Sequence, residues 1–189
     1  MHVNAKKIAF GGFFLALTEI FLLMGSVIQI NTLFLLAAAS YFVGIMIREF
    51  DLLLGAAFYL AGVLLGLLLT PNLFYVCSYA AMGAYILAVE AVWRLLGTLG
   101  GGKAERKDNS ANNRRRIRFF WVAKFLTFNC MFFLIIFFFR EFLFVGKMST
   151  TMQAGTIVAG QIGWLLYDRA YEWTQANLWS RMRGRLWKS

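Results

Sequence analysis

A small number of polar side chains interrupt the long apolar stretches of this sequence, and carboxylates and amides are prominent among them. Glu19 lies in the middle of the first stretch, and Gln161 and Asp168 lie two helical turns apart in the last one. An ionisable group at the centre of a bilayer costs about 2.5–3.5 kcal/mol on insertion scales, so each is a functional candidate. We expect Glu19 and Gln161 to be the pair best suited to a small polar ligand or a proton, with Asn129 and Trp164 as further ligand-binding residues.

Other carboxylates have a structural interpretation. Glu90 precedes Arg94 by four residues, a spacing that predicts an ion pair on one helix face. Asp168 and Glu172 have the same spacing and would repel each other unless a cation lies between them. Arg169 or the basic loop could supply that cation, and an ion network that fixes the helix end is favoured over a ligand site.

The motifs of common hydrolases and metal sites are missing from the sequence. The only histidine is His2, and there is no H-E-x-x-H, G-x-S-x-G or P-loop pattern. Cys77 and Cys130 lie inside apolar runs, where cysteine is a small packing residue. We therefore expect no enzyme, no metal and no cofactor, while a membrane enzyme that uses Glu19 or Asp168 is a less favoured alternative.

The composition indicates a membrane protein. Of the 189 residues, 60% are hydrophobic and 15% are charged, whereas a soluble domain has about 45–50% apolar and about 25% charged residues. The formal net charge of +10 would suit nucleic acid. However, the lysines and arginines cluster at the ends of apolar segments and no base-reading motif accompanies them, so we expect no nucleic-acid partner.

Six apolar runs predict an all-α, polytopic bundle of six transmembrane helices, because a spanning helix needs about 17–25 mainly apolar residues. The run 33–47 is short and could be tilted or re-entrant. Lys6 and Lys7 precede the first run, and basic residues crowd the loop before the fifth. Since cytoplasmic loops carry the excess of positive charge, both termini are expected inside a multi-pass protein of the cell membrane. The runs are Ile8–Ile28, Leu33–Ile47, Leu52–Leu69, Leu73–Trp93, Phe119–Phe139 and Met152–Tyr171.

These runs divide the chain into four parts. Residues 1–97 form a four-helix membrane half, 98–118 a basic flexible cytoplasmic loop, and 119–171 a two-helix membrane half. Residues 172–189 form a basic tail in which Trp179, Met182 and Leu186 recur at helical spacing. This pattern predicts an amphipathic helix that lies on anionic lipids of the inner leaflet.

Small residues recur at helical spacing on several runs, and such faces allow helices to pack closely in lipid. We expect most of them to pack inside the bundle. The first run carries a stripe that starts at the cytoplasmic end and that Glu19 continues, and it is the candidate surface for docking another membrane protein. This helix-one stripe consists of Ala5, Ala9, Gly12 and Ala16; the other faces are Gly55, Gly62 and Gly66, then Ala80, Ala84 and Ala88, then Gly155, Ala159 and Gly163.

The segments 6–18 (KKIAFGGFFLALT) and 62–68 (GVLLGLL) resemble the substrate-binding S-components of energy-coupling factor transporters. They are equally similar to small polytopic membrane proteins of Gram-positive bacteria. The first resemblance covers about the first 70 residues and implies that the helix-one stripe docks on a shared coupling subunit driven by two ATPases. The connection between the first two runs is very short, whereas that family often uses this loop as a lid over its vitamin site.

Two functions follow as hypotheses. The first is a small-molecule-binding subunit of a transporter, and the second is a non-catalytic scaffold or assembly partner of another membrane protein complex.

Overall fold

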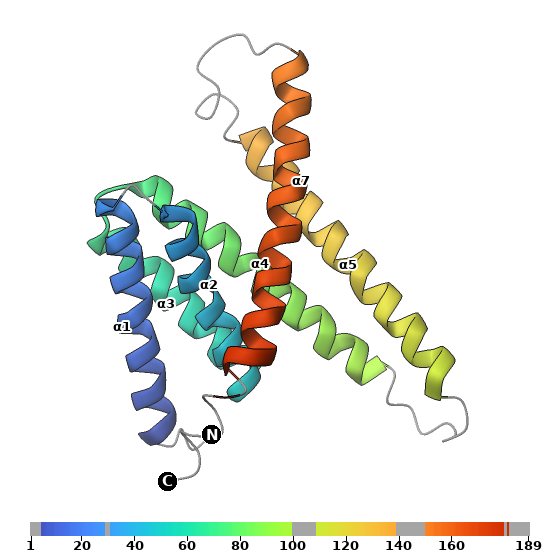
Figure 1. Ribbon diagram of the computed structural model, residues 1–189. Coiled ribbons are helices and arrows are strands. Elements are labelled where there is room, and N and C mark those ends of the chain that lie inside the picture. Colours follow the sequence, from blue (N-terminus) through green and yellow to red (C-terminus); the bar gives the residue numbers. More distant parts are fainter. Residues whose placement is uncertain (1–4, 29–30, 100–108, 139–149, 180, 182–189) are drawn as a thin grey trace. The chain divides into compact units, whose positions relative to one another are not determined.

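The computed structural model describes residues 5–28, 31–99, 109–138, 150–179 and 181, and the regular structure in these ranges is helical (Figure 1). This confirms the predicted all-α class. The elements are α1 (Ala5–Val27), α2 (Thr32–Glu49), α3 (Leu52–Leu69), α4 (Leu73–Leu99), α5 (Asn109–Phe138), α7 (Thr150–Trp173) and the π-helical turn η1 (Thr174–Trp179).

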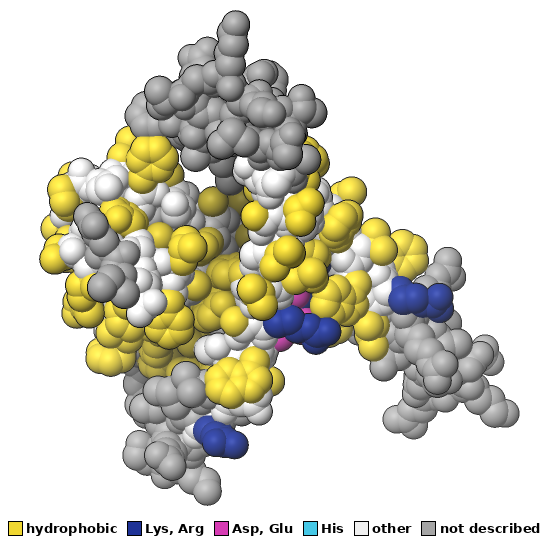
Figure 2. All heavy atoms as spheres, turned by 45° about the horizontal axis from the view of Figure 1, so that its top comes forward, with side chains coloured by type: hydrophobic (Ala, Val, Ile, Leu, Met, Phe, Trp, Pro, Cys, Tyr) yellow, Lys and Arg dark blue, Asp and Glu magenta, His cyan; other side chains and the backbone are white. Residues whose placement is uncertain are grey.

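Four of the described helices, α1 to α4, are long and apolar enough to cross a bilayer. The short run 33–47 belongs to an 18-residue helix, Thr32–Glu49, that meets this criterion. Large apolar side chains such as Phe13, Phe34 and Leu68 are exposed, and hydrophobic side chains cover much of the face drawn in Figure 2. An apolar exterior of this kind suits lipid rather than water, so these four helices are compatible with an integral membrane protein.

The turns between α1 and α4 are short because polar residues end each apolar run. Asp51 begins α3, and its carboxylate accepts a hydrogen bond from the Leu54 N–H at 2.7 Å, which satisfies an amide that has no partner within the helix. Asn72 accepts from the Phe74 N–H at 3.0 Å at the start of α4. Asn31 precedes α2 with a φ of 65°, a left-handed conformation that asparagine tolerates better than most residues.

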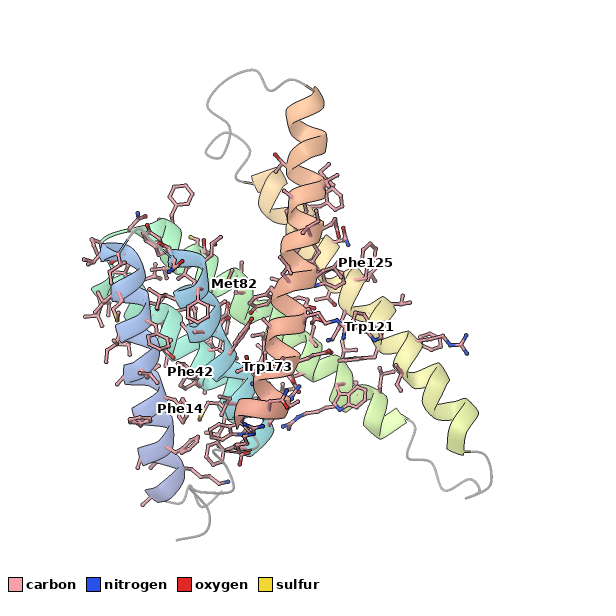
Figure 3. All side chains as sticks on the ribbon, in the orientation of Figure 1. Phe14, Phe42, Met82, Trp121, Phe125 and Trp173 are labelled. Carbon is pink, nitrogen blue, oxygen red and sulfur yellow. The ribbon has the colours of Figure 1, made fainter. Side chains whose placement is uncertain are left out.

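The chain forms two compact units, residues 1–123 and 124–189. In the first unit, α1 packs on α2 through aromatic rings, with the Phe14 and Phe42 centroids 5.0 Å apart (Figure 3). Near the end of α1 and the start of α2, Leu22 and Leu36 are buried with Tyr79 of α4 in one apolar cluster. The core of this unit therefore joins α1, α2 and α4.

Glycines allow α3 to approach its neighbours closely. A Cβ added to Gly62 would lie 2.6 Å from the Tyr79 hydroxyl, and one added to Gly66 would lie 3.2 Å from Leu22. A Cβ on Gly55 would collide with Ile47 of α2. The prediction that the small face of the third run packs inside the bundle is confirmed.

Helices α3 and α4 are antiparallel, and their contacts fix one register. The Tyr59 hydroxyl donates to the Ala80 carbonyl at 2.9 Å, and the Tyr59 ring lies against Gly83. Gly66, two turns further along α3, instead faces Val76, which comes earlier in α4. Each glycine thus receives a bulky side chain from the facing helix.

The small-residue faces of α1 and α7 are exposed, unlike the glycine face of α3. Ala5, Ala9, Gly12 and Ala16 are all exposed, and a Cβ on Gly12 would meet nothing within 4 Å. Glu19, which the same spacing placed on this stripe, is instead buried. Gly155, Ala159 and Gly163 of α7 are exposed too, so this face does not pack on the described residues of its own unit.

Helix α5 begins at Asn109, inside the segment 98–118 that the sequence predicts as a flexible loop. The sequence from Asn109 to Arg118 contains neither glycine nor proline, and arginine is a good helix former, so the helix extends beyond the apolar run. Residues 100–108 lie outside the described ranges, as do Met182 and Leu186 of the predicted interfacial tail.

Replacing Gly83 with alanine tests the packing of α3 on α4. The new Cβ would lie 2.8 Å from two ring carbons of Tyr59, whose hydroxyl is already bound to Ala80. We expect Gly83→Ala to be less stable than Gly12→Ala by about 1–3 kcal/mol, the usual cost of overpacking. Both substitutions replace glycine with alanine inside a helix and gain the same helix propensity. The difference between their free energies of unfolding, measured reversibly in bicelles, therefore reports the cost of packing alone. Equal stabilities would contradict this arrangement.

Candidate functional site

Glu19 is the one sequence-predicted ligand residue that lies in the first unit. It occupies the central part of α1 and is 6% exposed. Neither of its carboxylate oxygens has a hydrogen-bond partner among the described residues. Burying an ionised carboxylate without a partner costs several kcal/mol, so this side chain requires either a proton or a bound cationic group.

Tyr79 of α4 is the second unusual polar group in this interior. Its side chain is fully buried, and its hydroxyl also lacks a hydrogen-bond partner in the described part of the chain. These two buried groups both lie in the first unit, Glu19 on α1 and Tyr79 on α4. Leu22, one turn after Glu19, packs in the same cluster as Tyr79. We name this pair the Glu19–Tyr79 site.

Two buried hydroxyls of the same unit are satisfied within their own helices. Thr18 donates to the Phe14 carbonyl at 2.9 Å, and Ser40 donates to the Ala37 carbonyl at 2.7 Å. Such bonds to the preceding turn are the usual solution for a hydroxyl inside a helix. The Thr70 hydroxyl, at the end of α3, is also buried without a hydrogen-bond partner in the described chain, but Glu19 is the one carboxylate among the described residues in this condition.

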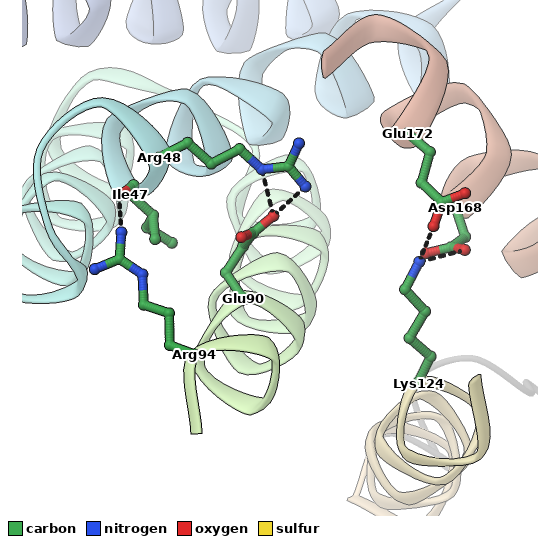
Figure 4. A network of polar contacts seen from close by, with 7 residues as sticks. All are labelled: Ile47, Arg48, Glu90, Arg94, Lys124, Asp168 and Glu172. Atoms are coloured by element: carbon green, nitrogen blue, oxygen red, sulfur yellow. Dashed lines mark hydrogen bonds and ion pairs between the residues drawn. The ribbon is translucent and has the colours of Figure 1, made fainter. Parts of the chain in front are cut away.

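The pairing predicted for Glu90 is wrong. Its carboxylate binds Arg48 of α2, with Oε1 at 2.7 Å from Nε and 2.5 Å from Nη2 (Figure 4). Arg94 instead donates to the Ile47 carbonyl. Carbonyls in the last turn of a helix have no partner within that helix, so Arg94 satisfies one at the end of α2. Both contacts tie α2 to α4.

In the second unit, Lys124 of α5 lies between the two carboxylates of α7. Its Nζ is 2.9 Å from Asp168 and 2.5 Å from Glu172 (Figure 4). The sequence interpretation required a cation here but assigned it to Arg169 or to the loop, and it overlooked Lys124. The signal was a single lysine inside the apolar run Phe119–Phe139, which has to face a carboxylate to be tolerated.

The other three predicted ligand residues contact one another or neighbouring aromatic rings on α5 and α7. Gln161 donates from Nε2 to Asn129 Oδ1 at 2.7 Å. Trp164 stacks on Phe128, with ring centroids 5.2 Å apart. Their amide and indole groups therefore join two antiparallel helices, and a ligand site shared by Gln161 and Glu19 stays a prediction.

The contacts of this pair keep one register. Lys124 faces Asp168, Phe128 faces Trp164, and a Cβ on Gly160 would meet the Phe132 ring. Each step of four residues forward along α5 matches a step of four residues backward along α7, as expected for antiparallel helices. We name this series of contacts the α5–α7 ladder.

No family model, curated protein or solved structure matches this chain. In the described ranges no three His, Cys, Asp or Glu side chains lie close enough together to hold a metal ion. The functional assignment therefore rests on the Glu19–Tyr79 site and on the exposed faces of the helices.

Lys124→Met tests the α5–α7 ladder. Lys124 is 2% exposed and Asp168 is 1% exposed, so the variant leaves a buried carboxylate without its cation. We expect a loss of about 3–5 kcal/mol, the usual cost of breaking a buried pair from one side. Thermal unfolding of the purified protein measures it.

Two variants serve as controls for this loss. Arg118→Met changes an exposed residue of the same helix and should alter stability by no more than about 0.5 kcal/mol. Adding Asp168→Asn and Glu172→Gln to Lys124→Met removes the unpaired charge and should recover most of the stability. If the triple variant is as unstable as the single one, charge pairing is not what holds α5 to α7.

Proposed function

We propose that this chain is an integral membrane protein whose first unit binds a small polar molecule at Glu19, as the ligand-binding subunit of a transporter. The observation that carries the proposal is the buried Glu19 carboxylate, whose two oxygens have no partner among the described residues. The four helices around this interior are long and apolar enough to cross a bilayer.

The comparison with the other buried carboxylates strengthens the proposal. Glu90 holds Arg48, and Asp168 holds Lys124. Both of these carboxylates therefore form ion pairs that join two helices. Glu19 forms none in the described chain, and a group kept at a cost to stability is the usual mark of a functional position.

Transport is the favoured context for such a site. Transporters bind their substrates near the middle of the membrane, between helices, and Glu19 occupies the central part of α1. The resemblance of segments 6–18 and 62–68 to S-components supports the same role, in which the binding subunit has no catalytic centre of its own.

Ligand-dependent stability tests this function. We expect at least one member of a panel of vitamins, amines, nucleosides and amino acids to raise the melting temperature of the purified protein. Glu19→Gln should abolish the increase while folding normally, because the carboxylate has no bond to lose. Glu49→Gln, a half-buried glutamate at the end of α2, is the matched control and should keep the increase. A panel without effect on the wild-type protein would refute the proposal.

A scaffold or assembly partner is the second candidate, favoured by the exposed helix-one stripe. Small residues that face outward allow another helix to approach the backbone closely. All four residues of the stripe are exposed, and Gly12 has open space beside it. This surface would also serve a transport subunit that docks on a coupling protein.

Co-purification from the native membrane tests the stripe. We expect the double variant Ala9→Leu and Gly12→Leu to lose a membrane-protein partner that the wild-type chain retains, because leucine prevents close helix approach. Its stability should change little, since neither position packs within the unit. Ala57→Leu, at an exposed alanine of α3, should keep the partner. Retention of the partner by the double variant would exclude the stripe as the docking surface.

A further inference from the structure

The Glu19–Tyr79 site carries one formal negative charge at most, which limits what it can bind. A divalent metal ion would remain undercompensated, and calcium takes six to eight oxygen ligands. In the described ranges no cluster of three acidic, His or Cys side chains exists to supply such ligands. One carboxylate is matched by one positive charge.

The surroundings of the site are apolar and aromatic. Tyr79 is buried with Leu22, Leu36 and Ala39, and Phe21, Val63, Tyr75 and Met82 pack against this cluster. The Tyr59 and Tyr79 rings lie with their centroids 6.3 Å apart. An inorganic cation would lose its water here and gain few oxygens. An alkylammonium ion instead brings its own apolar surface, and aromatic faces attract ammonium groups.

On the premise of the proposed function, we propose that the Glu19–Tyr79 site binds a small organic cation with a single positive charge. The Glu19 carboxylate pairs with the ammonium group, and the Tyr79 hydroxyl supplies a polar contact beside it. The alkyl part lies against the aromatic and aliphatic side chains of the cluster. This assignment gives both unpartnered polar groups of the site a partner.

Matched charged and neutral probes test the inference on the full chain in nanodiscs. The cations are choline and butylammonium, and their neutral counterparts are 3,3-dimethylbutan-1-ol and butan-1-ol. We expect both cations to raise the melting temperature and the alcohols of equal shape to bind at least about tenfold more weakly, the ratio that corresponds to 1.4 kcal/mol. Glu19→Gln should abolish cation binding, Tyr79→Phe should weaken it, and Glu49→Gln should leave it unchanged.

The outcomes separate this inference from the proposed function. If a neutral or anionic metabolite stabilises the wild-type protein through Glu19 while neither cation does, the inference fails and the binding function stands. If neither the panel nor the cations have any effect, both fail. A wild-type stability that depends on pH through Glu19, without any effect of the cations, would mean that the site holds only a proton and would overturn the inference. Should Glu19→Gln not fold, unchanged cation binding in Tyr79→Phe would overturn it as well.

Discussion

A polar side chain inside an apolar helical bundle must find its partner within the protein, because lipid offers none. This constraint accounts for which helices are neighbours here. Arg48 and Glu90 join α2 to α4, and Lys124 joins α5 to α7 through Asp168. Each contact bridges two helices and fixes their register, which apolar packing alone would leave poorly defined.

Close packing supplies the rest of the cohesion, since lipid chains are as apolar as leucine and burial no longer favours helix contact over lipid contact. Gly62 and Gly83 allow tyrosine rings to cross between α3 and α4, with Tyr79 lying over the first and Tyr59 over the second. The same rings bring polar hydroxyls into the interior. The Tyr59 hydroxyl donates to a carbonyl, whereas the Tyr79 hydroxyl has no hydrogen-bond partner in the described part of the chain.

Properties that depend on one helix could be predicted from the sequence, whereas the partners that charged side chains find on another helix could not. The bounds of α3 agree with the apolar run Leu52–Leu69 because polar residues close both of its ends. Glu19 was identifiable as a candidate because a lone carboxylate in an apolar run is visible without a structure. The partner of Glu90 was missed because spacing along α4 ranks Arg94 first, while the neighbouring α2 brings Arg48 nearer. Lys124 was missed for the same reason, since its carboxylates lie on another helix.

Burial of the Glu19 carboxylate costs stability, so a contribution to folding does not explain why this residue is present. A buried charge that is paired contributes little net stability, and an apolar side chain of similar size often serves the fold as well or better. A buried carboxylate without a partner is less favourable still, so the fold alone gives no reason to keep it. On α1 this carboxylate is buried, whereas the small residues Ala9 and Gly12 are exposed. One helix therefore carries, on its buried side, an acidic group without a hydrogen-bond partner in the described chain and, on its exposed side, a stripe of small residues.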